Sequence, residues 1–185
     1  MTSQPNTSAE PLQRLNAADY PVLAVLARAP AHGYDVWRYL NEHLGGVWKL
    51  GRSQVYALLS QLERRGLVHH ERVDQTNFPA RKVFHLTAEG RAVVDEWIQL
   101  PVHHVRDLRL EFPGKFHFAR SRSLGDASTL VRNQMEVCLH KRTDIEAAMA
   151  GCSLEIERQV LAYRIGVIDA TVTWLKSLIK SEQKR

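Results

Sequence analysis

Apolar residues recur at helical spacing in three short stretches near the start of the chain. In each stretch they fall three or four residues apart, the period that places side chains on one face of an α-helix. The pattern predicts helices over about residues 19–28, 33–44 and 51–65. A proline or a glycine follows each stretch and ends the helix.

Two short runs with the composition of strands follow the third predicted helix. They cover residues 67–73 and 81–86, and a polar loop over 74–80 separates them. Three short helices followed by a hairpin are typical of a winged helix-turn-helix, in which the hairpin forms a two-stranded wing. We therefore expect a mainly α fold that begins with this domain.

The remainder of the chain is predicted to be helical. Thr87 is an expected N-cap for a further helix, which Pro101 ends. The segment 102–124 has helical features, but Pro113-Gly114 is expected to interrupt them. A long helix is predicted from Asp126 to Ala150, and a second one follows the turn at Gly151.

The last predicted helix carries a broad apolar surface. Part of it is a coiled-coil-like seam, for which we predict a role in dimerisation: Leu161, Ile165, Ile168, Val172, Leu175 and Ile179. Val160, Val167 and Trp174 add a flank at seven-residue spacing, so the surface is wider than one neighbour requires. We expect packing against the preceding helix and against a second copy of the chain. A monomeric helical hairpin is the alternative.

These elements predict four segments. They are a disordered tail over residues 1–16, a winged helix-turn-helix domain over 17–100, a connecting segment over 101–125 and a helical dimerisation domain over 126–185.

Composition excludes several classes of protein. Of the 185 residues, 44% are apolar and 24% are charged, as in ordinary globular proteins, and the net charge is +5. We see no secretory signal and no apolar run of the roughly 18 residues that a membrane span needs. We therefore expect a cytoplasmic protein with no membrane partner.

The third predicted helix has a polar face opposite its apolar stripe. Arg52, Ser53, Tyr56 and Ser60 share this face, and Gln54 lies at its edge. Arg and Gln side chains can bind guanine and adenine edges in the major groove of double-stranded DNA. Taken alone, the face is better explained as ordinary solvated surface than as a DNA contact.

The predicted wing adds positive charge to the same region. Between Lys49 and Lys82 there are seven Lys and Arg residues but three Asp and Glu residues, a local net charge of +4. Arg81 and Lys82 lie where the returning strand leaves the loop, and such charges suit contacts with phosphates. The order of helices and basic hairpin favours DNA binding. A winged-helix module that binds proteins is the alternative.

Three strings of residues resemble the PadR family of bacterial transcriptional regulators. They are residues 32–35 (HGYD), 54–68 (QVYALLSQLERRGLV) and 81–90 (RKVFHLTAEG). The resemblance covers about residues 20–100, and it differs at Phe84, where the family often has Tyr. It implies that Gly33 and Tyr34 open a helix near the DNA backbone, that Tyr56 lies on the recognition helix, and that Arg81 and Lys82 lie on the wing.

The resemblance extends to longer PadR-like proteins with a helical C-terminal domain, including virulence-gene activators. Together with the seam on the last predicted helix, it leads us to predict a homodimer, whose two-fold symmetry suits a palindromic operator. We predict that it is a repressor, with an activator that has no effector as the alternative. The resemblance also implies an aromatic effector in some members, for which Trp97 is our candidate contact, although an aromatic residue at this spacing also suits a core.

Catalysis, metal binding and cofactors are not expected. The chain has no phosphate-binding loop, dinucleotide fingerprint or nucleophile motif. The adjacent histidines His69-His70 and His103-His104 diverge on a strand or a helix. We predict a protein that is not an enzyme and has no metal site.

Overall fold

The computed structural model describes residues 15–75 and 78–182. The elements in chain order are α1 (Asp19–Leu26), β1 (Ala31–His32), α2 (Gly33–Leu44), α3 (Arg52–Arg64), β2 (Val68–Gln75), β3 (Phe78–Leu86), α4 (Ala88–Gln99), α5 (Val105–Arg122), α6 (Leu124–Ala150) and α7 (Glu155–Glu182). Helices dominate, and the strands form one antiparallel sheet of order β1-β3-β2. This architecture confirms the predicted fold class.

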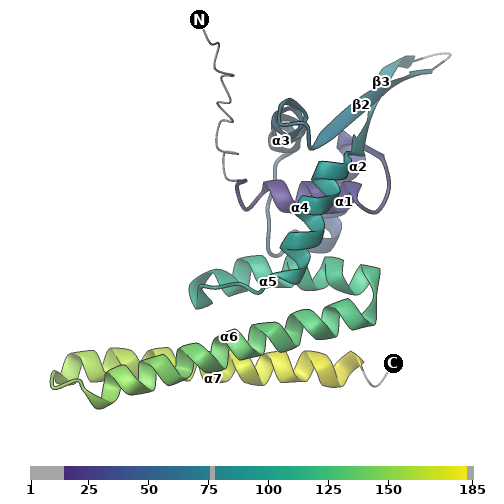
Figure 1. The fold of residues 1–185 in the computed structure, drawn as a ribbon. Coiled ribbons are helices and arrows are strands. Elements are labelled where there is room, and N and C mark those ends of the chain that lie inside the picture. The colour runs from purple at the N-terminus through teal and green to yellow at the C-terminus, as the bar shows by residue number, and fades with distance from the viewer. Residues whose placement is uncertain (1–14, 76–77, 183–185) are drawn as a thin grey trace, which may run out of the picture.

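The elements are arranged as a winged unit that sits on a layer of long helices (Figure 1). Helices α1 to α4 and the sheet form the winged unit, and the β2–β3 hairpin projects from its far end. Helices α6 and α7 lie side by side in antiparallel directions, as expected for two helices joined at Gly151, and α5 lies between them and the winged unit.

The core of the winged unit follows the predicted apolar stripes. On α3 the buried side chains are Val55, Leu58, Leu59 and Leu62, and on α2 they are Val36, Leu40 and Leu44. The helical spacing of the apolar residues on α2 also predicts a core position for Trp37, but this side chain is only partly buried.

The hairpin is longer than predicted, because β2 and β3 pair from Val68↔Leu86 to Gln75↔Phe78. Of the seven residues expected to form the loop, 74–75 lie in β2 and 78–80 in β3, and residues 76–77 lie outside the described residues. A third strand, β1, pairs with β3 at Ala31↔Phe84. Two residues are too few to show the alternation by which a strand is predicted.

A tight junction connects α3, the hairpin and α4. Gly66 adopts φ +72°, a left-handed conformation that turns the chain from α3 into β2. The Thr87 hydroxyl donates to the Gly66 carbonyl (2.8 Å) and accepts from the Gly90 amide (3.0 Å), so Thr87 is the N-cap that the sequence predicted. Gly90 is buried, and a Cβ there would overlap the Leu67 carbonyl oxygen.

Replacing Gly90 with alanine is therefore expected to destabilise the protein by about 1–3 kcal/mol, because backbone must move to admit the methyl group. Urea denaturation followed by circular dichroism measures the change. The control is Gly125→Ala in the first turn of α6, where the nearest atom to a new Cβ is Ser123 Oγ at 3.7 Å. Equal loss of stability in both variants would contradict the packing argument.

The predicted interruption at Pro113-Gly114 is wrong, because α5 runs unbroken from Val105 to Arg122 with Pro113 inside it. Proline removes one backbone donor, but the helix is held by packing of Phe112 and Phe118, which are fully buried. Gly114 serves this packing, because a Cβ there would overlap the Trp48 indole ring. Tertiary contacts override the local helix-breaking tendency.

The sequence predicted a disordered tail over residues 1–16. Of this tail, residues 1–14 lie outside the described residues, whereas Leu15 packs against the core.

Within residues 15–75 and 78–182 we find no helix with the length and apolar character to cross a membrane.

Candidate nucleic-acid interface

The predicted polar face of α3 lies on the surface of the winged unit. All five of its side chains are exposed: Arg52, Ser53, Gln54, Tyr56 and Ser60. Gly51 is the N-cap and provides no side-chain cap to the first turn. Amide groups of an uncapped first turn are free to donate to an anion such as a phosphate.

Arg52 is held in place by two aromatic rings from α2. Its guanidinium carbon lies 5.1 Å from the ring centroids of both Tyr34 and Trp37. The Trp37 indole donates to the Leu50 carbonyl (3.0 Å), which fixes this ring relative to the start of α3. Cation–π attraction at this distance restricts the guanidinium to one region of the surface.

The contact between Trp37 and Arg52 could not be predicted from the sequence, because the spacing of Trp37 on α2 indicated a core residue. The ring is partly buried and spans the two helices instead. A possible signal was the surplus of aromatic residues at the N-terminal end of α2, where Tyr34 and Trp37 lie three residues apart.

Gly33 and Tyr56 meet where α2 begins. A Cβ on Gly33 would lie 2.6 Å from Tyr56 Cε1, so the Tyr56 ring rests directly on the glycine backbone. Although Tyr56 is exposed, its position therefore depends on the absence of a side chain at residue 33. The contact brings together two residues that the family resemblance placed near DNA.

The basic residues of the hairpin are distributed over both of its faces. Arg81 and Lys82 are exposed, but as neighbours on β3 they point to opposite faces. Lys82 instead lies directly opposite Arg72 of β2, a residue that we did not single out as a site. Two like charges in this position repel each other, and an anion between them would relieve the repulsion.

The hairpin base is tied to α3 by a close side-chain pair. His70 Nδ1 lies 2.5 Å from Glu63 Oε1, and the His70 ring packs against Phe84. The His32 ring nitrogen Nδ1 hydrogen-bonds with the Lys82 carbonyl group (2.9 Å), which joins the start of α2 to β3. The basic strands and the polar face of α3 are thus fixed relative to each other.

The predicted dimerisation seam on α7 packs mostly inside the chain itself. Ile168, Val172 and Leu175 are buried, and the other three members are partly buried. The flank is more open. A row at three-, four- and seven-residue spacing, here called the open stripe, consists of partly buried Val167 and four exposed residues, Ile156, Val160, Tyr163 and Trp174.

Trp97 borders a cavity of about 560 Å³ between the chain start, α4 and α5. Its ring stacks on Tyr20 with centroids 5.3 Å apart, and its indole nitrogen is buried with no hydrogen-bond partner among residues 15–75 and 78–182. Lys115, also at this cavity, is buried and forms an ion pair with Glu111 (2.8 Å). Burial lowers the pKa of Lys115, whereas Glu111 acts in the opposite direction.

Comparison with known proteins gives a family match over the winged unit. Residues 22–96 match the sequence model of the transcriptional regulator PadR-like family. The match covers α1 to α4 and the sheet, apart from a few residues at each end.

Two curated proteins share a longer region. The chain is 26% identical over 129 residues to the negative transcriptional regulator PadR of Bacillus subtilis, covering 70% of this chain and 71% of that protein. It is 28% identical over 113 residues to a probable transcriptional regulator of Mycobacterium tuberculosis, covering 61% of this chain and 54% of that protein. These relatives are regulators, which confirms the prediction that the protein is not an enzyme.

A solved structure is also similar over most of the chain. It is the crystal structure of Bacillus subtilis PadR in complex with operator DNA, which is 25% identical, with 91% of this chain and 99% of that chain covered and a TM-score of 0.45.

Proposed function

We propose that the protein is a PadR-like homodimeric repressor that occupies a palindromic operator, because residues 22–96 match the sequence model of that family of transcriptional regulators. The observation that carries the proposal is the position of Arg52, exposed at the first turn of α3 and held between Tyr34 and Trp37. A guanidinium that is already oriented loses less freedom when it donates two hydrogen bonds to a guanine edge.

In this proposal α3 is the recognition helix and the hairpin is the wing. Ser53, Gln54 and Tyr56 accompany Arg52 in the major groove, while Arg72 and Lys82 bind phosphates. The negative sign of regulation is supported by the Bacillus subtilis relative, which is named a negative regulator. Such a function would place the protein in the cytoplasm, where bacterial operator DNA is found.

The dimer follows from the symmetry of the proposed operator. Two copies related by a two-fold axis would place their α3 helices about 34 Å apart, one turn of DNA. The open stripe on α7 is the surface that we assign to the second copy, because four of its five apolar side chains are exposed in the single chain. We also propose the winged helix-turn-helix domain over residues 17–100 and the helical dimerisation domain over 126–185, with α5 occupying most of the connecting segment between them.

DNA binding is tested by fluorescence anisotropy with the duplex upstream of the protein's own gene and with a scrambled duplex, at several salt concentrations. We expect tighter binding to the upstream duplex. The absence of measurable binding to any duplex at low salt would contradict the proposal.

The Lys82→Ala variant is expected to bind both duplexes more weakly, because a phosphate contact is independent of sequence. The slope of log affinity against log salt should fall by about one. The control is Lys176→Ala, which removes one exposed positive charge from α7. An unchanged slope in Lys82→Ala would show that this side chain binds no phosphate.

The cavity beside Trp97 favours a second element of the proposal, release by a small aromatic acid. The stacked rings of Tyr20 and Trp97 would form an aromatic wall beside the ligand, and Lys115 would bind its carboxylate. A chain of contacts connects the cavity to the Arg52 site. The Trp97 ring lies near the Trp48 ring, with centroids 6.4 Å apart. Trp48 is two residues before Leu50, whose carbonyl accepts the hydrogen bond from Trp37. An effector would act by binding better to the form that does not fit the operator.

We expect 4-hydroxybenzoate, used as a probe, to raise the thermal unfolding temperature and to weaken operator binding. Both effects should be lost in Lys115→Met, which keeps the apolar stem but removes the charge. The exposed Lys176→Ala variant should respond like the wild type. If Lys115→Met responds as strongly as the wild type, the acid does not bind at this cavity.

A further inference from the structure

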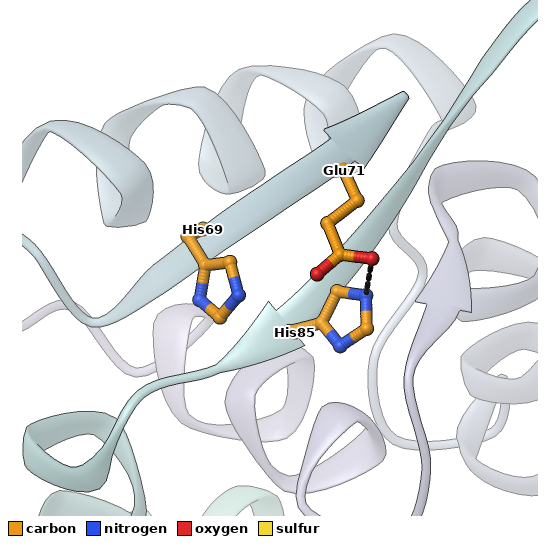
Figure 2. Close-up of side chains that lie close together, drawn as sticks. All are labelled: His69, Glu71 and His85. Atoms are coloured by element: carbon orange, nitrogen blue, oxygen red, sulfur yellow. Dashed lines mark ion pairs between the residues drawn. The ribbon is translucent and has the colours of Figure 1, made fainter. Parts of the chain in front are cut away.

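One face of the hairpin gathers three side chains that can bind a metal ion. His69 and Glu71 come from β2 and His85 from β3, and Figure 2 shows the three converging on one side of the two strands. Their potential ligand atoms, one from each residue, all lie within 4.8 Å of one another.

Strand register explains why these residues meet. His69 and His85 are direct partners in the antiparallel pairing, which brings their rings into a stack with centroids 5.1 Å apart. Glu71 lies two residues after His69 and therefore on the same face. We expected no metal site because His69 and His70 diverge. They do diverge, but the partner of His69 is on the next strand.

The distance between Glu71 and His85 suits two ligands of one ion. Glu71 Oε2 and His85 Nε2 are 3.6 Å apart, longer than a hydrogen bond. Two ligands at opposite ends of a tetrahedron edge, with bonds of 2.0–2.1 Å to zinc, are about 3.3 Å apart. A small side-chain adjustment would close the difference.

One ring nitrogen of His85 also lacks a hydrogen bond within the described part of the chain. Its Nε2 atom is buried and makes no hydrogen bond with any described residue. Burying such an atom without a hydrogen-bond partner is unfavourable, and a bound cation would offset that cost. By contrast, His70 faces the other side of the hairpin, where it is engaged by Glu63.

We propose that His69, Glu71 and His85 bind one divalent transition-metal ion, with Zn²⁺ as the best fit. Two imidazoles and one carboxylate form a known set of zinc ligands, and water completes the tetrahedron. All three residues lie on the accessible part of the hairpin, since His69 and Glu71 are exposed and His85 is partly exposed. The ion would link β2 to β3 and fix their register.

This site does not depend on the proposed DNA binding, and its test needs no DNA. Full-length protein freed of metal with a chelator and dialysed is titrated with Zn²⁺ in competition with a chromophoric chelator. We expect one equivalent to bind per chain. His69→Asn, His85→Asn and Glu71→Gln should each lower the affinity by more than about tenfold, because losing even a residue that only supports a ligand costs about 10- to 100-fold.

The matched control is His140→Asn, which removes an exposed histidine from α6 and should leave the affinity unchanged. Circular dichroism verifies that each variant is folded, and Glu71→Gln changes an exposed side chain without altering its size. As a second readout, Zn²⁺ should slow amide hydrogen exchange in β2 and β3 of the wild type but not of His85→Asn.

The proposal is overturned if the wild type does not compete with the chelator for Zn²⁺. It is also overturned if the folded variants at residues 69, 71 and 85 bind Zn²⁺ as tightly as the wild type, because the ion then binds elsewhere.

Discussion

Replacing Arg52 with alanine is expected to weaken binding to the operator by about 10- to 100-fold, the effect of losing 1–3 kcal/mol of base discrimination. Binding to scrambled DNA should fall much less, because a lost base contact matters only where the matching base is present. Fluorescence anisotropy with both duplexes at one fixed salt concentration measures the ratio.

The aromatic clamp around Arg52 allows a sharper version of this experiment. Arg52→Lys keeps the charge but loses the planar guanidinium that stacks on Tyr34 and Trp37 and forms paired hydrogen bonds. It should therefore lose most of the specificity. Tyr34→Leu leaves Arg52 intact but removes one ring from the clamp, so we expect a smaller loss of specificity.

A matched control is available on the same helix. Arg64 is exposed at the C-terminal end of α3, and Arg64→Ala removes the same charge far from the first turn. It should leave the specificity ratio unchanged. If Arg52→Ala weakens binding to both duplexes equally, Arg52 binds a phosphate and not a base. If neither affinity changes, Arg52 lies outside the interface.

Elements governed by local sequence were predictable. The apolar stripe of α3, with Val55 and Leu62 at its ends, requires only the helical period, and the N-cap at Thr87 requires only its own hydroxyl. The polar face of α3 follows from the same period, so the exposed residues around Arg52 could be named from the sequence alone.

Features that depend on contacts between elements were not predictable. The continuity of α5 through Pro113 depends on packing around it, including the Trp48 ring that rests on Gly114. The clamp formed by Trp37 depends on how α2 crosses α3. The pairing of His69 with His85 depends on a strand register that no single strand pattern contains.

The two apolar rows of α7 illustrate the same limit. The seam and the flank consist of similar residues at similar spacing, so the sequence could not tell which row packs within the chain. The structure buries the seam member Leu175 completely, whereas Val160 and Tyr163 remain 52% and 73% exposed. The surface that we propose for a second copy is therefore the open stripe, next to the seam that we predicted.

The double variant Val160→Glu, Tyr163→Glu is expected to be a folded monomer in sedimentation velocity experiments. Charged side chains in an apolar interface would be desolvated without partners, which costs more than the interface gains. Operator affinity should fall about 100-fold or more, because the second half-site is then no longer bound by a linked copy. Both positions are exposed in the single chain, so the unfolding temperature should change little.

Two controls separate the open stripe from the seam. Ala162→Glu adds a charge at an exposed position on another side of α7 and should leave the dimer intact. Leu175→Ala makes a cavity in the seam and is expected to cost about 2–5 kcal/mol of stability without dissociating the folded dimer. If the double variant remains a dimer while Leu175→Ala dissociates, the seam is the interface after all. The α6–α7 packing of the single chain would then have to open when two copies associate.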